Sequence, residues 1–288
     1  METSATPPTT AVAPRTNASV QAAVGEVTGE MGGIKLLYLK PTYGVGGQHD
    51  AGFDEGTLVI DGKFSVSTKK DPVPVIIIGA TQFWKDWLGQ AEFAAGIKSQ
   101  RYPDEASAIA AGKRTQWIDD PAGGTNPVTG RPARLGPQAA AAFDLKVLVR
   151  KPASTKDAKG DEVNVDTEFF LRIGEYFYCP SLITFEKMAY APFSQVLLQS
   201  RVMAAQEQKV SVQHAKLHRW LYQLGTEILP AKTGRKSALI PKLSRMLDPQ
   251  TKRGAVLAEA DVAELEGLMA ALSNASAAAG EASSEPMP

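Results

Sequence analysis

The sequence predicts an α+β protein in which a β-rich body comes first and a helical segment follows. An uninterrupted apolar run at residues 75–78 (VIII) is typical of a strand that is buried on both faces at the centre of a sheet. Beyond Tyr190 the apolar residues recur at helical spacing, with Leu217, Leu221 and Leu224 on one stripe. Strands followed by helices favour this class over an alternating parallel fold.

The composition of the 288-residue chain excludes several classes of protein. Lysine and arginine together balance aspartate and glutamate, so the net charge is zero. The single cysteine, Cys179, rules out an intramolecular disulfide framework and a multi-cysteine zinc site. No apolar run approaches the roughly 20 residues of a membrane span, and the N-terminus does not resemble a secretory signal. We therefore expect a cytoplasmic protein without a membrane partner.

The distribution of residue types predicts four segments. Residues 1–30, rich in Ala, Thr and Pro, have little to bury and are expected to form a disordered arm. Residues 31–188 form the β-rich domain, and residues 189–273 the helical segment. Residues 274–288 are expected to be a second disordered tail.

Within the β-rich domain, local signals place the elements. The pair Asp61-Gly62 between two apolar runs is a strong signal for a hairpin of residues 57–60 and 63–67. The central strand is predicted to end at Gly79, and Thr81 is a plausible N-cap for a helix carrying Phe83, Trp84 and Trp87. Further predicted elements are a strand at 34–40, a helix at 106–111, a Gly/Pro loop at 120–137, a strand at 143–149 and a strand-rich stretch at 163–185.

The helical segment is predicted to hold four helices. Their apolar residues follow a helical period, and Pro230 ends the second helix. The predicted ranges are 192–206, 210–229, 237–247 and 259–272.

No catalytic or metal-binding pattern is present. His214 and His218 are four residues apart on a predicted helix, but Ala215 stands where a zinc protease needs glutamate. The acidic residues that a hydrolase or nuclease would use are scattered over loops (Asp119, Asp120, Asp161 and Asp166). We therefore expect a non-enzymatic protein without a metal or another cofactor.

Charge is distributed unevenly along the C-terminal part. Residues 209–253 hold ten basic and two acidic side chains, whereas residues 254–288 hold six acidic side chains and no basic one. Such segregation is typical of a protein that binds a polyanion and carries an acidic tail. The alternative is that the two segments neutralise each other.

Aromatic residues are expected to lie near cations in two parts of the predicted sheet. In the predicted strand at 176–179, Tyr176 and Tyr178 share one face. Exposed aromatic rings among cations hold single-stranded nucleic acid by stacking on bases and neutralising phosphates. The candidate nucleic-acid-binding residues are Lys35, Tyr38, Lys40, Tyr43, Lys146, Arg150, Arg172, Tyr176 and Tyr178.

The order of these pieces resembles proteins of the replication modules of tailed bacteriophages. The similar stretches are GGIKLLYLKPTYG, the hairpin, VPVIIIG, RYPDEASAIAAG and FFLRIGEYFYCPSLITFEK, over about residues 31–190. The resemblance implies an OB-fold-like barrel and a role in single-stranded DNA binding or replication. It also implies an acidic C-terminal region that recruits replication proteins, although the terminal aromatic residue of many such tails is missing here.

The sequence therefore predicts a sequence-tolerant single-stranded DNA-binding protein that acts in phage DNA replication or recombination. The alternative is a structural or interaction protein of a virion that does not bind nucleic acid. Alanine-rich tails and a net charge of zero fit that alternative equally well.

Overall fold

The computed structural model describes residues 36–43, 51–88, 92, 95, 97, 99–125, 130–163, 171–230 and 237–282, with side chains up to residue 270. The predicted arm at 1–30 lies outside these residues, as does the end of the predicted tail. Residues 36–268 form one compact unit, and residues 1–35 with 269–288 are assigned to another. All strands of the sheet belong to the first unit.

A ten-stranded sheet is the main structure of this unit. Its strands run in the order β12-β11-β4-β8-β10-β1-β2-β3, and β5 and β9 pair with β4 and β10 at the side of this path. The pairing of β1 with β10 is parallel, and the other ladders are antiparallel. The strands are β1 (Leu37–Pro41), β2 (Leu58–Ile60), β3 (Phe64–Ser67), β4 (Val73–Asp86), β5 (Arg101–Tyr102), β8 (Ala139–Arg150), β9 (Leu171–Ile173), β10 (Tyr176–Phe185), β11 (Leu221–Leu229) and β12 (Ala238–Arg245).

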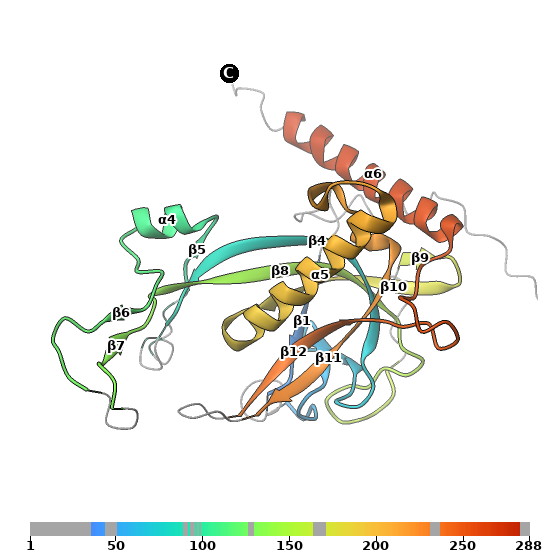
Figure 1. Ribbon diagram of the computed structural model, residues 1–288. Helices are drawn as coiled ribbons and strands as arrows, with labels where there is room; N and C mark the ends of the chain where they lie inside the picture. The colour runs from blue at the N-terminus through green and yellow to red at the C-terminus, as the bar shows by residue number, and fades with distance from the viewer. Residues whose placement is uncertain are drawn as a thin grey trace, which may run out of the picture. The chain divides into compact units, whose positions relative to one another are not determined.

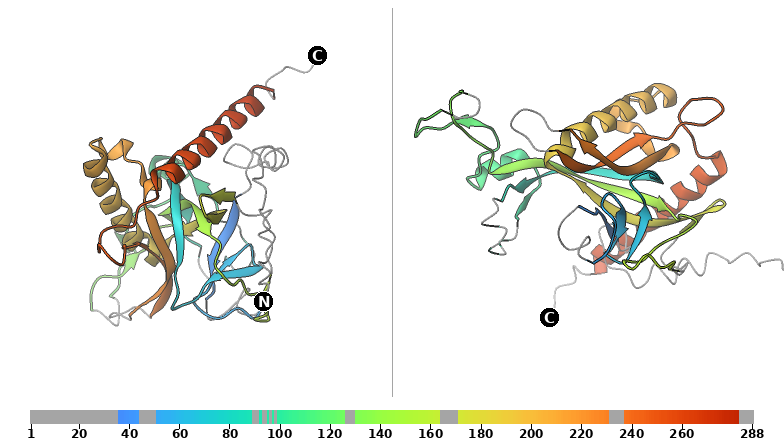
Figure 2. Two further views of the ribbon diagram at one scale, coloured as in Figure 1. Left: turned by 90° about the vertical axis from the view of Figure 1, so that its right-hand side faces the viewer. Right: turned by 90° about the horizontal axis from the view of Figure 1, so that it is seen from below.

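The sheet is curled, and helix α5 (Tyr190–Gln208) packs on its concave face (Figure 1). One apolar cluster joins residues from both ends of the sheet, such as Leu58 and Leu243, with Phe193 and Leu197 of α5. The rings of Phe185 and Phe193 stack with their centroids 4.0 Å apart. Figure 2 shows α5 beside β11 and β12 from two further directions. Burial of these side chains supplies the main driving force for the fold.

The long strands β4 and β8 continue beyond the α5 core (Figure 1). At their far end lie β5, the short helix α4 (Glu105–Ala110) and a small second sheet of β6 (Ile118–Asp119) and β7 (Arg134–Leu135). The side chain of Asp104 accepts a hydrogen bond from the Ser107 N–H and caps α4, which corresponds to the helix predicted at 106–111. Of the Gly/Pro loop predicted at 120–137, the described residues 120–125 and 130–137 lie outside the strands except for β7.

Several local predictions are confirmed. Residues Asp61 and Gly62 both adopt positive φ, 49° and 71°, in the turn between β2 and β3. The strands predicted at 34–40, 143–149 and 163–185 correspond to β1, β8, β9 and β10. The apolar run at 75–78 lies in β4, between β11 and β8, as predicted for a central strand. The α+β class with a β-rich body is therefore correct.

The helix predicted to begin at Thr81 is wrong, because β4 continues as one strand from Val73 to Asp86. A bulge between Ile77 and Gly79 takes the place of the predicted strand end. Beyond it, residues 81–86 pair with the start of β8, where four successive alanines offer small partners to Phe83 and Trp84. The ladder overrides the local helix signal.

The helices predicted at 210–229 and 237–247 are also wrong. Residues 221–229 and 238–245 form the hairpin of β11 and β12, which pairs with β4 at one end of the sheet. Alternation of Trp220, Tyr222 and Leu224, all buried, directs one face of β11 toward the core. Among the described residues of the segment 189–273, α-helix is therefore confined to its two ends, in α5 and in α6 (Glu259–Ala282). The latter continues past Leu272 into the predicted tail, where alanines favour helix.

Candidate nucleic-acid interface

The convex face of the sheet carries most of the predicted binding residues. Cross-strand partners point to the same face of a sheet, so the register identifies the face of each residue. Gly79 pairs with Lys146, Lys146 with Leu182, and Leu182 with Tyr38. These four positions form one row across four strands, on the face opposite the α5 core.

Two exposed tyrosines lie at the β1 side of this face. The side chain of Tyr38 is 54% exposed, and the Lys40 Nζ lies 5.8 Å from the centroid of its ring. Tyr43, just beyond β1, is 49% exposed. Partial burial and the nearby Glu186 carboxylate raise the pKa of its hydroxyl. Tyr43 is therefore neutral at physiological pH, and it lies near the end of β10.

The second half of β4 adds cations to the same face. Lys85 pairs with Glu186 at 2.8 Å, Nζ to Oε2. Next to it, Arg101 of β5 forms a two-pronged ion pair with Asp144, with N–O distances of 2.8 and 3.2 Å. Asp144 is largely buried and also accepts a hydrogen bond of 2.6 Å from the Thr184 hydroxyl. These contacts hold the side chains in place along the strand.

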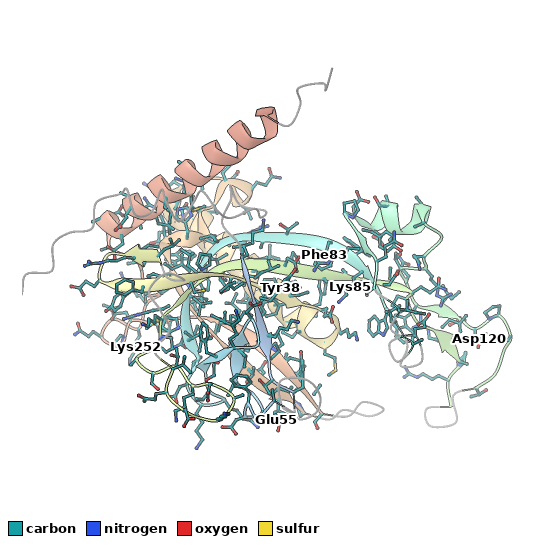
Figure 3. All side chains as sticks on the ribbon, turned by 180° about the vertical axis from the view of Figure 1, so that it is seen from behind. Tyr38, Glu55, Phe83, Lys85, Asp120 and Lys252 are labelled. Atoms are coloured by element: carbon teal, nitrogen blue, oxygen red, sulfur yellow. The ribbon has the colours of Figure 1, made fainter. Side chains whose placement is uncertain are left out.

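We call this surface the convex-face band. It combines two exposed aromatic rings with five cations, and the two carboxylates beside it, Glu186 and Asp144, are engaged with Lys85 and Arg101. Figure 3 shows its members Tyr38 and Lys85 on the face turned away from α5, with Phe83 of β4 near Lys85. The band consists of Tyr38, Lys40, Tyr43, Lys85, Arg101, Lys146 and Lys187.

The bulge in β4 is what places Lys85 in this band. Before the bulge, Val75 and Ile77 face the concave core, and after it Gly79 pairs with Lys146 on the convex face. The extra residue, Ile78, thus reverses which residues point outward. Thr81, Phe83 and Lys85 consequently face outward, whereas Gln82 faces α5 and donates a hydrogen bond to the Tyr190 hydroxyl.

The prediction that Tyr178 binds nucleic acid is wrong. Tyr178 lies on the convex face as predicted, but it is only 1% exposed and cannot stack on a base. The first turns of α6 reach this end of the sheet, where the Gly174 N–H donates to Glu264 and Val262 and Leu265 are buried. Burial, together with the nearby Asp261 carboxylate, raises the pKa of the Tyr178 hydroxyl despite the opposing effect of Arg150.

The remaining predicted residues are placed less favourably. Tyr176 is 42% exposed, but the Arg150 guanidinium lies 3.1 Å from its ring centroid and occupies one face of the ring. Arg172 pairs with Phe177 and so has its register position on the opposite face from Tyr176. Lys35 lies outside the described residues. The structure therefore brings together Tyr38, Lys40, Tyr43 and Lys146 from the predicted set.

The basic and acidic C-terminal segments contact each other. The Glu266 carboxylate lies 3.0 Å from the His218 Nε2 and 2.9 Å from the Lys216 Nζ, and Glu259 pairs with Arg219. The hydrogen bond from His218, followed by that from Lys216, lowers the pKa of Glu266 to about 2. Lys242 pairs with Glu227 within the β11–β12 hairpin. Mutual neutralisation, one of the two interpretations of this charge pattern, thus holds for these residues.

The described residues contain no group of three or more His, Cys, Asp or Glu side chains placed to hold a metal ion. His214 and His218 lie on two separate 3₁₀ turns instead of one helix. The lone thiol, Cys179, is buried in the core, and burial raises its pKa to about 11. No helix in the described part of the chain is long and apolar enough to cross a membrane.

Sequence reasoning missed Lys85, Arg101 and Lys187. The predicted helix at 81–88 assigned Lys85 no face of the sheet, and Arg101 was expected in the approach to a helix. Residues 81–86 (TQFWKD) do not alternate between polar and apolar side chains, so the residue types gave no signal for this strand.

Comparisons with protein-family models, with curated proteins and with solved structures found no match to this chain. The function is therefore inferred from the chain's own sequence and geometry.

Proposed function

We propose that this protein binds single-stranded DNA without strong sequence preference, through the convex-face band, and acts in phage DNA replication or recombination. The replication role comes from the sequence resemblance. The binding mode comes from the arrangement of aromatic rings and cations on the convex face.

One observation carries the proposal: the sheet register places Tyr38 and Lys146 in one row, with Lys40 beside Tyr38 on the same face. Stacking on exposed aromatic rings is tolerant of sequence because every base has a π-face. Cations at fixed positions beside the rings neutralise the phosphates that follow the stacked bases. A sheet holds these groups more rigidly than a loop does, which lowers the entropic cost of binding.

Local charge favours a polyanion on this face although the whole chain is neutral. The band holds five cations, and Lys40 and Lys146 are in no ion pair with any residue in the described part of the chain. A DNA phosphate can approach Lys85 and Arg101 while their ion pairs with Glu186 and Asp144 stay intact. No buried charge then loses its partner. Binding is therefore expected to weaken with salt, because phosphate neutralisation releases counterions.

Two finer expectations belong to this proposal. A closed OB-like barrel is implied by the resemblance, but among the described strands no ladder joins β12 to β3, the two ends of the main path. Recruitment of replication proteins by the acidic C-terminal region is the other. Glu259, Glu264 and Glu266 already contact the body, so recruitment would rest on acidic residues beyond them.

The test compares two tyrosines that are similarly exposed on one face. Tyr38→Ala is expected to weaken binding of fluorescein-labelled oligo-dT by about 5- to 100-fold, which corresponds to ~1–3 kcal/mol for one stacked base. Tyr176→Ala is the matched control, because Arg150 already covers one face of that ring. Its affinity is expected to stay within about twofold of the unmodified protein.

Salt dependence gives the second readout. Lys146→Ala is expected to reduce the slope of log affinity against log salt by about 0.7, the value for one single-strand phosphate. Oligo-dT that does not bind at low salt would refute the proposal and favour the virion-protein alternative. Equal losses for Tyr38→Ala and Tyr176→Ala would refute the assignment to the convex-face band.

A further inference from the structure

A surface hollow lies at the far end of β4 and β8, where the convex-face band ends. Its volume is about 460 Å³, within the range of ~300–1,000 Å³ typical of small-molecule sites. Asp86, Trp87, Lys113, Arg114, Trp117 and Gln138 are among the residues that line it. Trp87 directly follows β4, and the Lys187 Nζ lies 5.9 Å from the centroid of its ring. Lys187 and Trp87 thus connect the band with the hollow.

The polar wall of the hollow is held in place by hydrogen bonds. The Asp86 carboxylate accepts from the Tyr102 hydroxyl at 3.1 Å and from the Gln100 N–H at 3.2 Å. It also pairs with the Lys113 Nζ at 3.2 Å. Because Asp86 is compensated in this way, it does not repel an anionic ligand as a free carboxylate would. The wall is preorganised for a ligand, which lowers the cost of binding.

Arg114 and Gln138 form the opposite part of the wall. The Arg114 Nε and Nη2 both donate to the Gly136 carbonyl, at 2.9 and 2.7 Å. Its backbone N–H donates to the Gln138 Oε1 at 3.1 Å. Within the described part of the chain, no hydrogen bond uses the Arg114 Nη1 or the Gln138 Nε2. Both groups are donors, so they suit the phosphate or carbonyl oxygens of a ligand.

Two exposed tryptophans supply the aromatic surface. Trp117 is 54% exposed and Trp87 is 41% exposed. The Trp117 ring lies against Gly136, where an added Cβ would come within 3.2 Å of the ring. Glycine therefore allows one edge of this ring to rest on the backbone while more than half of the side chain stays accessible. Large exposed aromatic rings in a polar hollow are typical of sites that stack a planar ligand.

We infer that this hollow binds one nucleobase of the same single strand, stacked on Trp117, with Arg114 and Gln138 donating hydrogen bonds to its nucleotide. This inference rests on the proposed function of the convex-face band. The Gly79–Asp86 part of β4 spans roughly 23 Å at ~3.3 Å per residue. A long strand therefore reaches both Tyr38 and the hollow, whereas a short oligonucleotide occupies one of them.

The experiment measures binding of fluorescein-labelled oligo-dT of about 12 and about 4 nucleotides to the full-length protein. Trp117→Ala is expected to weaken binding of the longer oligonucleotide by about 5- to 100-fold, and Trp117→Phe by much less. Ile118→Ala, at a similarly exposed neighbouring position that does not line the hollow, is the matched control and is expected to bind normally. Thermal unfolding of each variant checks that the fold is kept.

The outcomes separate the two proposals. If Tyr38→Ala weakens binding and Trp117→Ala does not, the assignment of a base to the hollow is refuted and the assignment of the convex-face band stands. Equal losses of affinity with Trp117→Ala and Ile118→Ala also refute the assignment of a base to the hollow. Absence of oligo-dT binding by the unmodified protein at low salt overturns the proposed function itself. Binding of dTMP in the hollow by a protein that binds no oligo-dT would contradict the assignment to a strand.

Discussion

The two halves of strand β4 differ in what their side chains contact. In the first half, Val75, Ile76 and Ile77 are buried, and the strand lies between β11 and β8 with both faces covered. In the second half, Thr81 and Lys85 lie on the convex side and Gln82 and Trp84 on the concave side, and Thr81 and Gln82 are both exposed. The first half is structural, and the second half presents side chains to solvent.

The bulge at Ile78 separates the two halves. It follows three successive buried aliphatic residues and places the later residues Thr81 and Lys85 on the convex face. A one-residue shift of register moves every later side chain to the opposite face. The bulge therefore determines that Lys85 faces the convex side, where it pairs with Glu186.

Insertion of one alanine between Gly79 and Ala80 is expected to have the largest effect, because it would turn Thr81 and Lys85 toward the concave face. We expect the free energy of unfolding to fall by more than ~4 kcal/mol, or the fold to be lost. Chemical denaturation followed by far-UV circular dichroism measures this. Deletion of Ile78 is the control: it removes the unpaired residue and leaves Gly79 opposite Lys146, so a smaller loss is expected. An insertion variant of near-normal stability would contradict the role given to the register of β4.

Side-chain truncations in the two halves of β4 are expected to differ in their cost to the free energy of unfolding, and this is the next largest effect. Ile77→Ala removes a buried side chain from the core cluster and is expected to cost ~2–5 kcal/mol. Thr81→Ala, four residues later on the exposed face, is expected to change the unfolding free energy by no more than ~0.5 kcal/mol. The same denaturation series measures both. Equal costs would mean that the two halves do not differ in the way described.

The Arg101–Asp144 pair is expected to show a smaller effect. Removing Arg101 leaves Asp144 largely buried with only the Thr184 hydrogen bond, at an expected cost of ~1–3 kcal/mol. Replacement of both residues by alanine is expected to cost less than the sum of the single changes. A double-mutant cycle measures this coupling. Additive single effects would show that the pair is screened by solvent.

Local signals in the sequence predicted the elements whose causes are themselves local. Turn chemistry identified the β2–β3 hairpin through Asp61-Gly62, and acidic residues in the first turn together with Gly112 past the end identified the helix at α4. The β11–β12 hairpin was missed because Leu217, Leu221 and Leu224 fit a helical period. In the fold, Trp220, Tyr222 and Leu224 alternate instead, and pairing with β4 selects the strand.

The candidate site shows the same contrast between residues placed by local signals and residues placed by contacts far apart in the sequence. Tyr38, Lys40, Tyr43 and Lys146 were predicted because aromatic residues and cations were expected to lie near one another on the sheet, and the structure brings them to one face. Tyr178 was assigned wrongly because its cover, α6, lies far away in the sequence. Lys85 and Arg101 were missed because a bulge leaves no local signature in the residue types around it.

Lysine acetylation footprinting locates bound DNA on the protein surface and so tests the convex-face band itself. The protein is treated with an acetylating reagent with and without saturating oligo-dT at low salt, and the modified lysines are quantified by mass spectrometry. We predict protection of Lys40 and Lys146, and unchanged modification of Lys252, an exposed lysine outside the convex-face band. Oligo-dT that binds but leaves Lys40 and Lys146 as reactive as Lys252 would contradict the proposed interface.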